Sequence, residues 1–135
     1  MIAAYRIGLL AAASVALGAL GSEALHSQEQ PPAYLIGQIE VSDPVGYAKE
    51  YLPKAREIIK AHGGRLIAAG GAASGSKVVA VDGEAPKRVI IYVYPSMEAL
   101  LAWRHDPDYV KVRHIGEKYA SYHTFAVEGA PSHSP

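Results

Sequence analysis

Three titratable side chains stand where they could move a proton. His114 lies in a predicted helix, and His123 and Glu40 lie in predicted strands. An imidazole changes its charge near neutral pH, so either histidine is a candidate general base. Glu40 shares a strand face with Gln38, and burial of that face would make its carboxylate basic enough to abstract a proton. The alternatives are a solvent-exposed strand end for Glu40 and ordinary surface roles for both histidines.

Further side chains are candidates to contact a small organic molecule: Tyr34, Gln38, Tyr92, Trp103, Tyr109 and Arg113. The guanidinium of Arg113 matches a carboxylate bidentately. The structural alternatives are core packing for Trp103 and Tyr109 and an ion pair between Arg113 and Glu117, one helical turn on. Arg65 and Arg88 begin strands, so we interpret both as solvated strand ends.

The residues that several other chemistries require are missing or wrongly spaced. The chain has no cysteine, which excludes a disulfide, a thiol nucleophile and a thiolate metal site. No two of the six histidines have the i,i+4 spacing of a helical zinc site, and no nucleotide-binding glycine motif or G-x-S-x-G elbow occurs. The 13 acidic and 13 basic residues balance, so no basic field exists for nucleic acid or an anionic membrane. We predict neither a metal nor a cofactor.

The N-terminal residues 1–28 are typical of a processing segment. Arg6 precedes an uncharged run over residues 7–20, which has the length of a secretory signal's apolar region and is short for a membrane span. We therefore expect an exported protein, periplasmic or secreted, with an uncleaved N-terminal anchor as the alternative. Residues 29–32 are predicted to be a linker, residues 33–130 one domain, and residues 131–135 a tail.

Within the domain, the candidate functional residues must be positioned by four strands. Runs of β-branched and aromatic residues predict strands over residues 33–41, 88–94 and 121–128. A further strand begins at residues 65–69, is interrupted by small residues, and resumes at residues 78–81. We interpret these two pieces as one long bent arm with a bulge.

Helix signals separate these strands. Asp43-Pro44, Ser96 and Asp106-Pro107 each place an N-capping side chain before a helical pattern. Pro53 lies inside the first pattern and predicts a kink or a split there. The resulting β-α-β-β-α-β order predicts a ferredoxin-like α+β fold with a four-stranded antiparallel sheet.

The helices of such a fold cover one face of the sheet. The strands at residues 33–41 and 88–94 are apolar on both faces, so the second face is predicted to be too apolar for water. Its expected lining is Tyr92, Tyr94, Ile36 and Val78. The simplest cover is a second copy of the chain, so we predict a homodimer.

An ordered set of short motifs resembles one family over residues 33–130. The motifs are Gly63-Gly64-Arg65, Lys87-Arg88, Pro95-Ser96-Met97-Glu98-Ala99, Trp103, Pro107-Asp108-Tyr109, Arg113 and Val127-Glu128-Gly129. The chain resembles the domain of unknown function 1330 family, which is similar to the dimeric α/β-barrels. The resemblance implies that two ferredoxin-like protomers close an eight-stranded barrel. Members of that wider group include cofactor-free monooxygenases, muconolactone isomerases, haem enzymes and stress-associated proteins. The chain departs from the pattern beside Trp103, where it has Arg104 and His105.

We expect a pocket between helix and sheet, lined by the six ligand candidates and His123. Three functions remain open: an enzyme that acts without a metal, oxygenase- or isomerase-like, on a small organic molecule; a non-catalytic binding or stress protein; and a structural dimer without a ligand. Converging titratable groups in a cavity favour the first, an apolar cavity with one arginine favours the second, and a filled core favours the third.

Overall fold

The sheet has four antiparallel strands. The computed structural model describes residues 30–72 and 74–131. The strands are β1 (Ala33–Val41), β2 (Arg65–Gly71), β3 (Arg88–Tyr94) and β4 (Ala120–Glu128), in the spatial order β2-β3-β1-β4. The central place of β1 explains why both of its faces carry apolar residues. The predicted ferredoxin-like α+β fold is confirmed.

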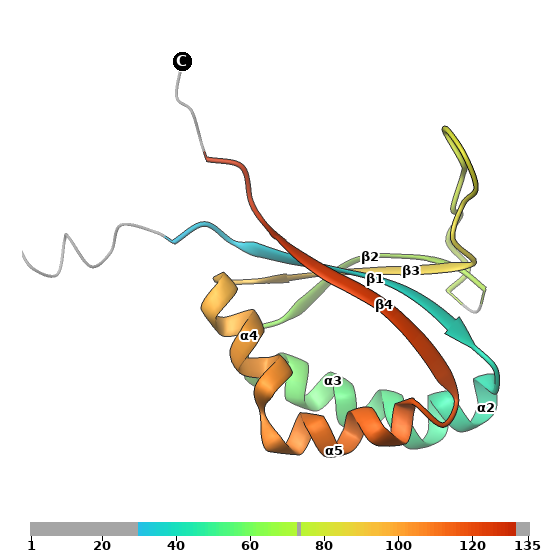
Figure 1. Ribbon diagram of the computed structural model, residues 1–135, viewed down its shortest axis with the longest axis horizontal. Coiled ribbons are helices and arrows are strands. Elements are labelled where there is room, and N and C mark those ends of the chain that lie inside the picture. The colour runs from blue at the N-terminus through green and yellow to red at the C-terminus, as the bar shows by residue number, and fades with distance from the viewer. Residues whose placement is uncertain (1–29, 73, 132–135) are drawn as a thin grey trace, which may run out of the picture. The chain divides into compact units, whose positions relative to one another are not determined.

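The helices lie together on one face of the sheet (Figure 1). They are α2 (Pro44–Gly46), the π-helical turn η1 (Tyr47–Tyr51), α3 (Leu52–Ala61), α4 (Met97–His105) and α5 (Pro107–Gly116). The three predicted N-caps are confirmed, because the side chains of Asp43, Ser96 and Asp106 accept backbone N–H groups at 3.1, 3.1 and 2.8 Å. Each cap satisfies a donor that the helix itself leaves free.

Pro53 divides the first helical segment, as predicted. The π-helical turn comes just before it and closes with the Leu52 N–H donating to the Tyr47 carbonyl. Pro53 is then near the start of α3, where its missing N–H costs no helical bond. The turn places Tyr47 and Tyr51 in the core.

The two faces of the sheet differ in cover. Ala33, Leu35 and Ile39 of β1 are buried under the helices, whereas the alternate residues point away from them. We call this second surface the open face; neighbouring residues on it are Tyr34, Ile36, Gln38 and Glu40 of β1, Val89, Ile91 and Val93 of β3, and Ser121, His123, Phe125 and Val127 of β4. Ile36, expected to line an apolar second face, does lie on the open face.

Two tyrosines expected on the open face point the other way. Tyr92 and Tyr94 pair with Leu35 and Ala33, so both belong to the helix-covered face. Tyr94 is part of the core. The prediction was wrong because β3 has no polar residue after Arg88, and the periodicity of residues 89–94 therefore carried no information on direction.

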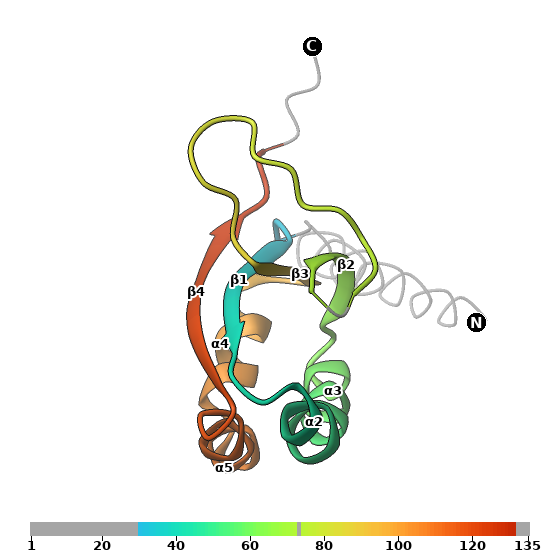
Figure 2. The same cartoon turned by 90° about the vertical axis from the view of Figure 1, so that its right-hand side faces the viewer.

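The second strand is shorter than predicted. A bulge between Leu66 and Ala68 is present, but β2 ends at Gly71, and the described residues of the loop that connects it to β3, 72 and 74–87, contain no strand. The expected continuation at residues 78–81, Val78 included, lies in this loop. The loop projects from the sheet on the side opposite the helices (Figures 1 and 2).

The predicted processing segment at residues 1–28, Glu29 of the linker and residues 132–135 of the tail lie outside the described residues. Residues 30–32 and 131 have no regular structure. Among the described helices, none has the length and apolarity to cross a bilayer.

Candidate functional site

A cluster of aromatic rings fills the space between helices and sheet. The rings of Tyr47 and Tyr51 lie 4.9 Å apart, and Tyr122 of β4 lies 5.9 Å from Tyr51. The Tyr51 and Tyr109 hydroxyls are hydrogen-bonded at 2.9 Å. The Trp103 ring lies 4.3 Å from that of Tyr109, and Tyr94 follows at 5.7 Å from Trp103. The core reading of Trp103 and Tyr109 is thus the one that the structure shows.

The phenols of this cluster are held in their neutral form. Burial raises the pKa of the Tyr51, Tyr94 and Tyr122 hydroxyls far above the ordinary value for tyrosine. Burial likewise raises the pKa of Tyr47, and the positive charge of Arg88 opposes this shift only in part. At neutral pH these groups offer hydrogen-bond donors and not phenolate bases.

Several donors in the cluster have no partner. Within the described part of the chain, buried polar atoms without a hydrogen bond are Tyr94 Oη, Trp103 Nε1, Arg113 Nε and Tyr122 Oη. The Tyr122 hydroxyl approaches those of Tyr47 and Tyr51 without reaching hydrogen-bond geometry. Unsatisfied buried donors are rare in native proteins, and water or a bound molecule commonly supplies the acceptor.

Arg113 contacts both the cluster and a surface carboxylate. Its guanidinium lies 3.5 Å above the Tyr122 ring. Its Nε is 3.5 Å from Glu117 Oε1, which realises the i,i+4 ion pair considered from the sequence. The Arg113 side chain is therefore already engaged from two sides.

A cleft of about 510 Å³ opens where β1 ends and β3 and β4 begin. Its lining is Ile39, Glu40, Val41, Ser42, Pro44, Ala72, Lys87, Arg88, Glu117, Ala120 and Ser121. The Arg88 guanidinium lies 5.1 Å over the Tyr47 ring, so the cleft borders the aromatic cluster. Neither Lys87 nor Arg88 forms an ion pair with any carboxylate in the described residues. The sequence interpretation of Arg88 as a solvated strand end missed this site.

A smaller hollow of about 220 Å³ adjoins this cleft on the open face. It is lined by Gln38, Glu40, Pro86, Lys87, Ser121, Tyr122 and His123, and three of these residues, Glu40, Lys87 and Ser121, also line the cleft. Gln38 is directly opposite His123, and Glu40 is opposite Ser121. His123 and Glu40 are thus diagonal neighbours on one face, within reach of a shared ligand.

The sheet separates the predicted ligand-binding and catalytic candidates into two groups. Tyr92, Trp103, Tyr109 and Arg113 lie on the helix side, whereas Tyr34, Gln38, Glu40 and His123 lie on the open face. One pocket between helix and sheet, as predicted, therefore cannot contain them all. His114 belongs to neither group, because its exposed ring lies on α5 with Nδ1 3.5 Å from Glu117 Oε2.

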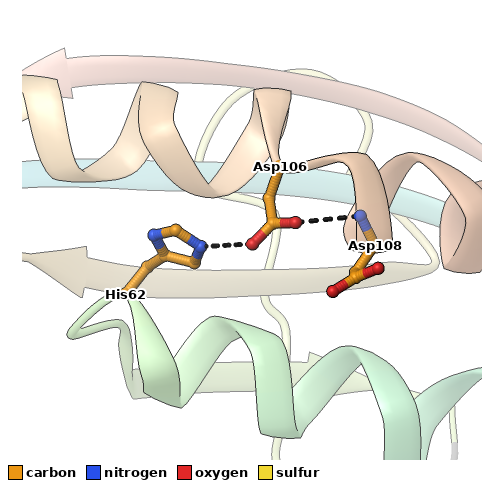
Figure 3. A network of polar contacts seen from close by, with 3 residues as sticks. All are labelled: His62, Asp106 and Asp108. Carbon is orange, nitrogen blue, oxygen red and sulfur yellow. Dashed lines mark hydrogen bonds and ion pairs between the residues drawn. The ribbon is translucent and has the colours of Figure 1, made fainter.

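A histidine–aspartate pair lies at the start of α5, whereas the cleft lies at its end. His62 Nε2 is 2.7 Å from Asp106 Oδ2, and the other Asp106 oxygen accepts the Asp108 N–H (Figure 3). The hydrogen bond from His62, followed by that from the Asp108 backbone, lowers the pKa of the Asp106 carboxyl. The pair connects the end of α3 to the α4–α5 junction, and we interpret it as structural because neither described pocket reaches it.

Within residues 30–72 and 74–131, no three histidine, aspartate or glutamate side chains converge to hold a metal ion.

The family model described as a domain of unknown function, DUF1330, matches residues 32–130. The chain belongs to this family. The match spans every strand and helix of the described fold, so the cleft and the open face are both parts of the DUF1330 domain. No curated protein matches the sequence.

Solved structures share the fold of this DUF1330 chain at low sequence identity. A protein of unknown function from Rhodopseudomonas palustris is 13% identical with a TM-score of 0.56, over 83% of this chain and 92% of that one. SnoaB, a cofactor-independent oxygenase from Streptomyces nogalater, is 8% identical with a TM-score of 0.53, over 76% and 96%. A hypothetical protein from Arabidopsis thaliana is 11% identical with a TM-score of 0.50, over 82% and 97%. These likenesses show a common fold.

Proposed function

We propose that this DUF1330 protein binds a small, negatively charged organic molecule in the cleft. The observation that carries the proposal is the pair Lys87 and Arg88, which line the cleft without a carboxylate partner in the described residues. The cleft's volume of about 510 Å³ is in the range of small-molecule sites. The Arg88 guanidinium lies over the buried Tyr47 ring, which is not itself part of the cleft's lining, so the cleft would recognise its ligand by charge, and the ligand class is an organic carboxylate or enolate.

The adjoining hollow supports a catalytic role at the same end of the sheet. His123 and Glu40 are candidate bases beside Lys87. A base there removes a proton from a carbon of the substrate, and the cationic side chains stabilise the resulting enolate. Dioxygen then oxidises the enolate by forming a C–O bond at that carbon, and the peroxide takes back the proton from the base to give a hydroperoxide. SnoaB has the same fold and is a cofactor-independent oxygenase, which favours this reaction over others. An isomerase uses the same first step and returns the proton to another carbon.

Ligand binding is tested with a charged probe and its neutral isostere. Calorimetric titration with benzoate should show binding, and benzamide should bind at least tenfold more weakly, a difference of about 1.4 kcal/mol. Arg88→Gln should reduce this preference, because it removes one of the two cationic side chains of the cleft and keeps a polar side chain there. Arg65→Gln is the matched control, since Arg65 also begins a strand but lies at the opposite end of the β2–β3 pair. Equal binding of the two probes, or an equal effect of both variants, would contradict the proposal.

Catalysis is tested separately from binding. Native mass spectrometry of protein purified from its own host should identify a retained ligand. An oxygen electrode should then record uptake above the protein-free rate with that ligand, and His123→Ala or Glu40→Gln should slow it. Deuterium entry into the ligand without oxygen uptake identifies an isomerase. Binding without either reaction leaves the non-catalytic binding protein as the function.

We also propose that the protein acts as a homodimer and is exported. The apolar open face supports the dimer, because a two-layer domain leaves that face without cover. The signal-like residues 1–28 support export. N-terminal sequencing of protein from the host tests export: a start near residue 25–30 is expected, and an intact Met1 would indicate the anchor.

A further inference from the structure

The loop over residues 72–87 carries an apolar run that contacts little. Val79 is 74% exposed and Val81 is 91% exposed, and Gly75 and Gly83 bracket the run with positive φ angles of 74° and 73°. Together these two valines present apolar surface of the kind that a protein partner covers. We call residues 77–86 the arm.

The base of the arm is fixed to the sheet. The Gly71 N–H donates to the Ser76 carbonyl at 3.0 Å, and the Ala72 N–H donates to the Lys87 carbonyl at 3.3 Å. Val78 packs over Gly70, where any Cβ would overlap it. Among the described residues, the arm itself makes no backbone–backbone hydrogen bond. The arm therefore extends from an anchored base, and its backbone N–H and C=O groups can pair with another strand.

The same chain has a strand edge that lacks a neighbour. β4 pairs with β1 along all nine of its residues, and no described strand occupies its other edge. Phe125 and Val127 on this strand are 47% and 48% exposed. A long apolar edge strand is a template for another β-strand, and soluble proteins normally cover it.

We propose that the arm of one copy pairs, as an added β-strand, with the free edge of β4 in a second copy. The arm extends on the open-face side, where the second copy of the proposed homodimer would lie (Figures 1 and 2). Residues 81–83 form a bend in the single copy. Pairing would extend it, so that Val79 and Val81 point to one side and stand beside Phe125 and Val127 of the other copy.

A second copy of this chain fits better than a different protein. Each copy carries both the strand and the edge, so a two-fold axis satisfies both sites at once and leaves neither open. Contact between two open faces would still leave the edge of β4 exposed, and the added strand would cover that edge. Because Ala72 and Lys87 at the base of the arm line the cleft, the exchange would also hold the cleft's wall in place. The inference rests on the proposed homodimer.

Hydrogen exchange of the full protein tests the arm directly. In the wild-type dimer, the peptide over residues 120–128 should contain more slowly exchanging amides than pairing with β1 alone explains. The double variant Val79→Pro/Val81→Pro removes two backbone donors from exposed positions. It should speed the exchange of that peptide at least tenfold and weaken dimerisation. Val79→Thr/Val81→Thr is the matched control, because it keeps the donors and the β-branched shape, and it should retain protection.

The outcomes separate the arm from the dimer. If the wild type is a monomer at micromolar concentration, the homodimer fails and the arm exchange fails with it. If the wild type is a dimer and the proline variant changes neither exchange nor dimerisation, only the arm exchange is overturned. Far-ultraviolet circular dichroism of both variants should match that of the wild type, which shows that they fold. If the proline variant does not fold, a deletion of residues 78–81 replaces it in the same measurement.

Discussion

Arg113 makes two interactions whose strengths differ because their environments differ. The guanidinium lies on the Tyr122 ring, and the Arg113 side chain is 13% exposed, whereas the Glu117 side chain is 50% exposed. A desolvated cation–π contact contributes about 2 kcal/mol, and an ion pair with a half-exposed partner contributes about 0.5 kcal/mol or less. The contact with the ring should therefore dominate.

Arg113→Met should lower the free energy of unfolding by about 1–2 kcal/mol, because it keeps much of the side chain's volume and loses the contact of charge with ring. Glu117→Gln should lower it by less than about 0.5 kcal/mol. Urea denaturation measures both. Equal losses would mean that the ion pair, and not the ring, holds Arg113 in place.

Asp106 should make the stability of the protein sensitive to acid. Its hydrogen bond from His62 lowers the pKa of the carboxyl in the folded protein. A group of this kind adds stability above the pKa of the unfolded chain, near pH 4. That contribution is lost as the pH falls through the folded value, because the folded state then has to take up a proton.

Asp106→Asn keeps an N-capping side chain and removes the charge. Thermal unfolding of the wild type should therefore lose stability more steeply below about pH 4 than that of this variant. Asp108→Asn is the control, because it removes a carboxylate from the same helical turn without touching His62. If Asp106→Asn lost stability in acid as steeply as the wild type, the pair of Asp106 with His62 would not be the cause of the acid sensitivity.

At the scale of elements, Gly116 sets how closely α5 can approach β4 and η1. A Cβ at this position would overlap the Tyr122 hydroxyl and approach the Tyr51 ring at 2.7 Å. Alanine is a better helix former than glycine by about 1 kcal/mol, but overpacking a core costs about 1–3 kcal/mol. The packing cost should win at this buried site.

Gly116→Ala should thus destabilise the protein by roughly 1–2 kcal/mol. Tyr122→Phe should be nearly neutral, because that hydroxyl has no hydrogen-bond partner in the described residues. In the double variant the removed hydroxyl makes room for the new methyl group, so about 1 kcal/mol of the loss should return. Chemical denaturation of the three variants gives the coupling, and strict additivity would mean that the methyl group clashes elsewhere.

The elements that local chemistry defines could be predicted from the sequence. The N-caps at Asp43, Ser96 and Asp106 and the split at Pro53 depend on a few neighbouring atoms, and all were confirmed. The direction of Tyr92 could not be predicted, because β3 has no polar face to define its phase.

The candidate site required information that only the tertiary fold contains. Gln38 and His123 are 85 positions apart in the sequence and become neighbours through the pairing of β1 with β4. Arg88 acquired its place over Tyr47 in the same way, since η1 and β3 meet only in the folded chain. The valine run at residues 78–81 has the composition of a strand but pairs with no strand among the described residues.

At the scale of the whole molecule, the unequal cover of the two sheet faces is the main constraint. The helix-covered face contains the core, whereas the open face presents a band of apolar residues: Tyr34, Ile36, Ile91, Val93, Phe125 and Val127. A monomer would leave these in water, and a band of this kind is typical of a protein–protein interface. The polar hollow with His123 and Glu40 lies at the end of the band, so an apposed second copy would also border the proposed catalytic groups.

A single charge in this band should separate the two copies of the proposed homodimer. Phe125→Glu places a carboxylate in an interface without a cationic partner on the same band, and burying such a charge is strongly unfavourable. The dissociation constant of the dimer should rise at least 100-fold, a change of about 2.7 kcal/mol. Val110→Glu is the matched control, because Val110 is an exposed apolar residue on α5 in the helix layer, and it should leave the dimer intact. Sedimentation velocity over a range of concentrations measures both. A wild-type protein that sediments as a monomer would refute the proposed dimer. A Phe125→Glu variant that dimerises as tightly as Val110→Glu would place the contact between copies away from the open face.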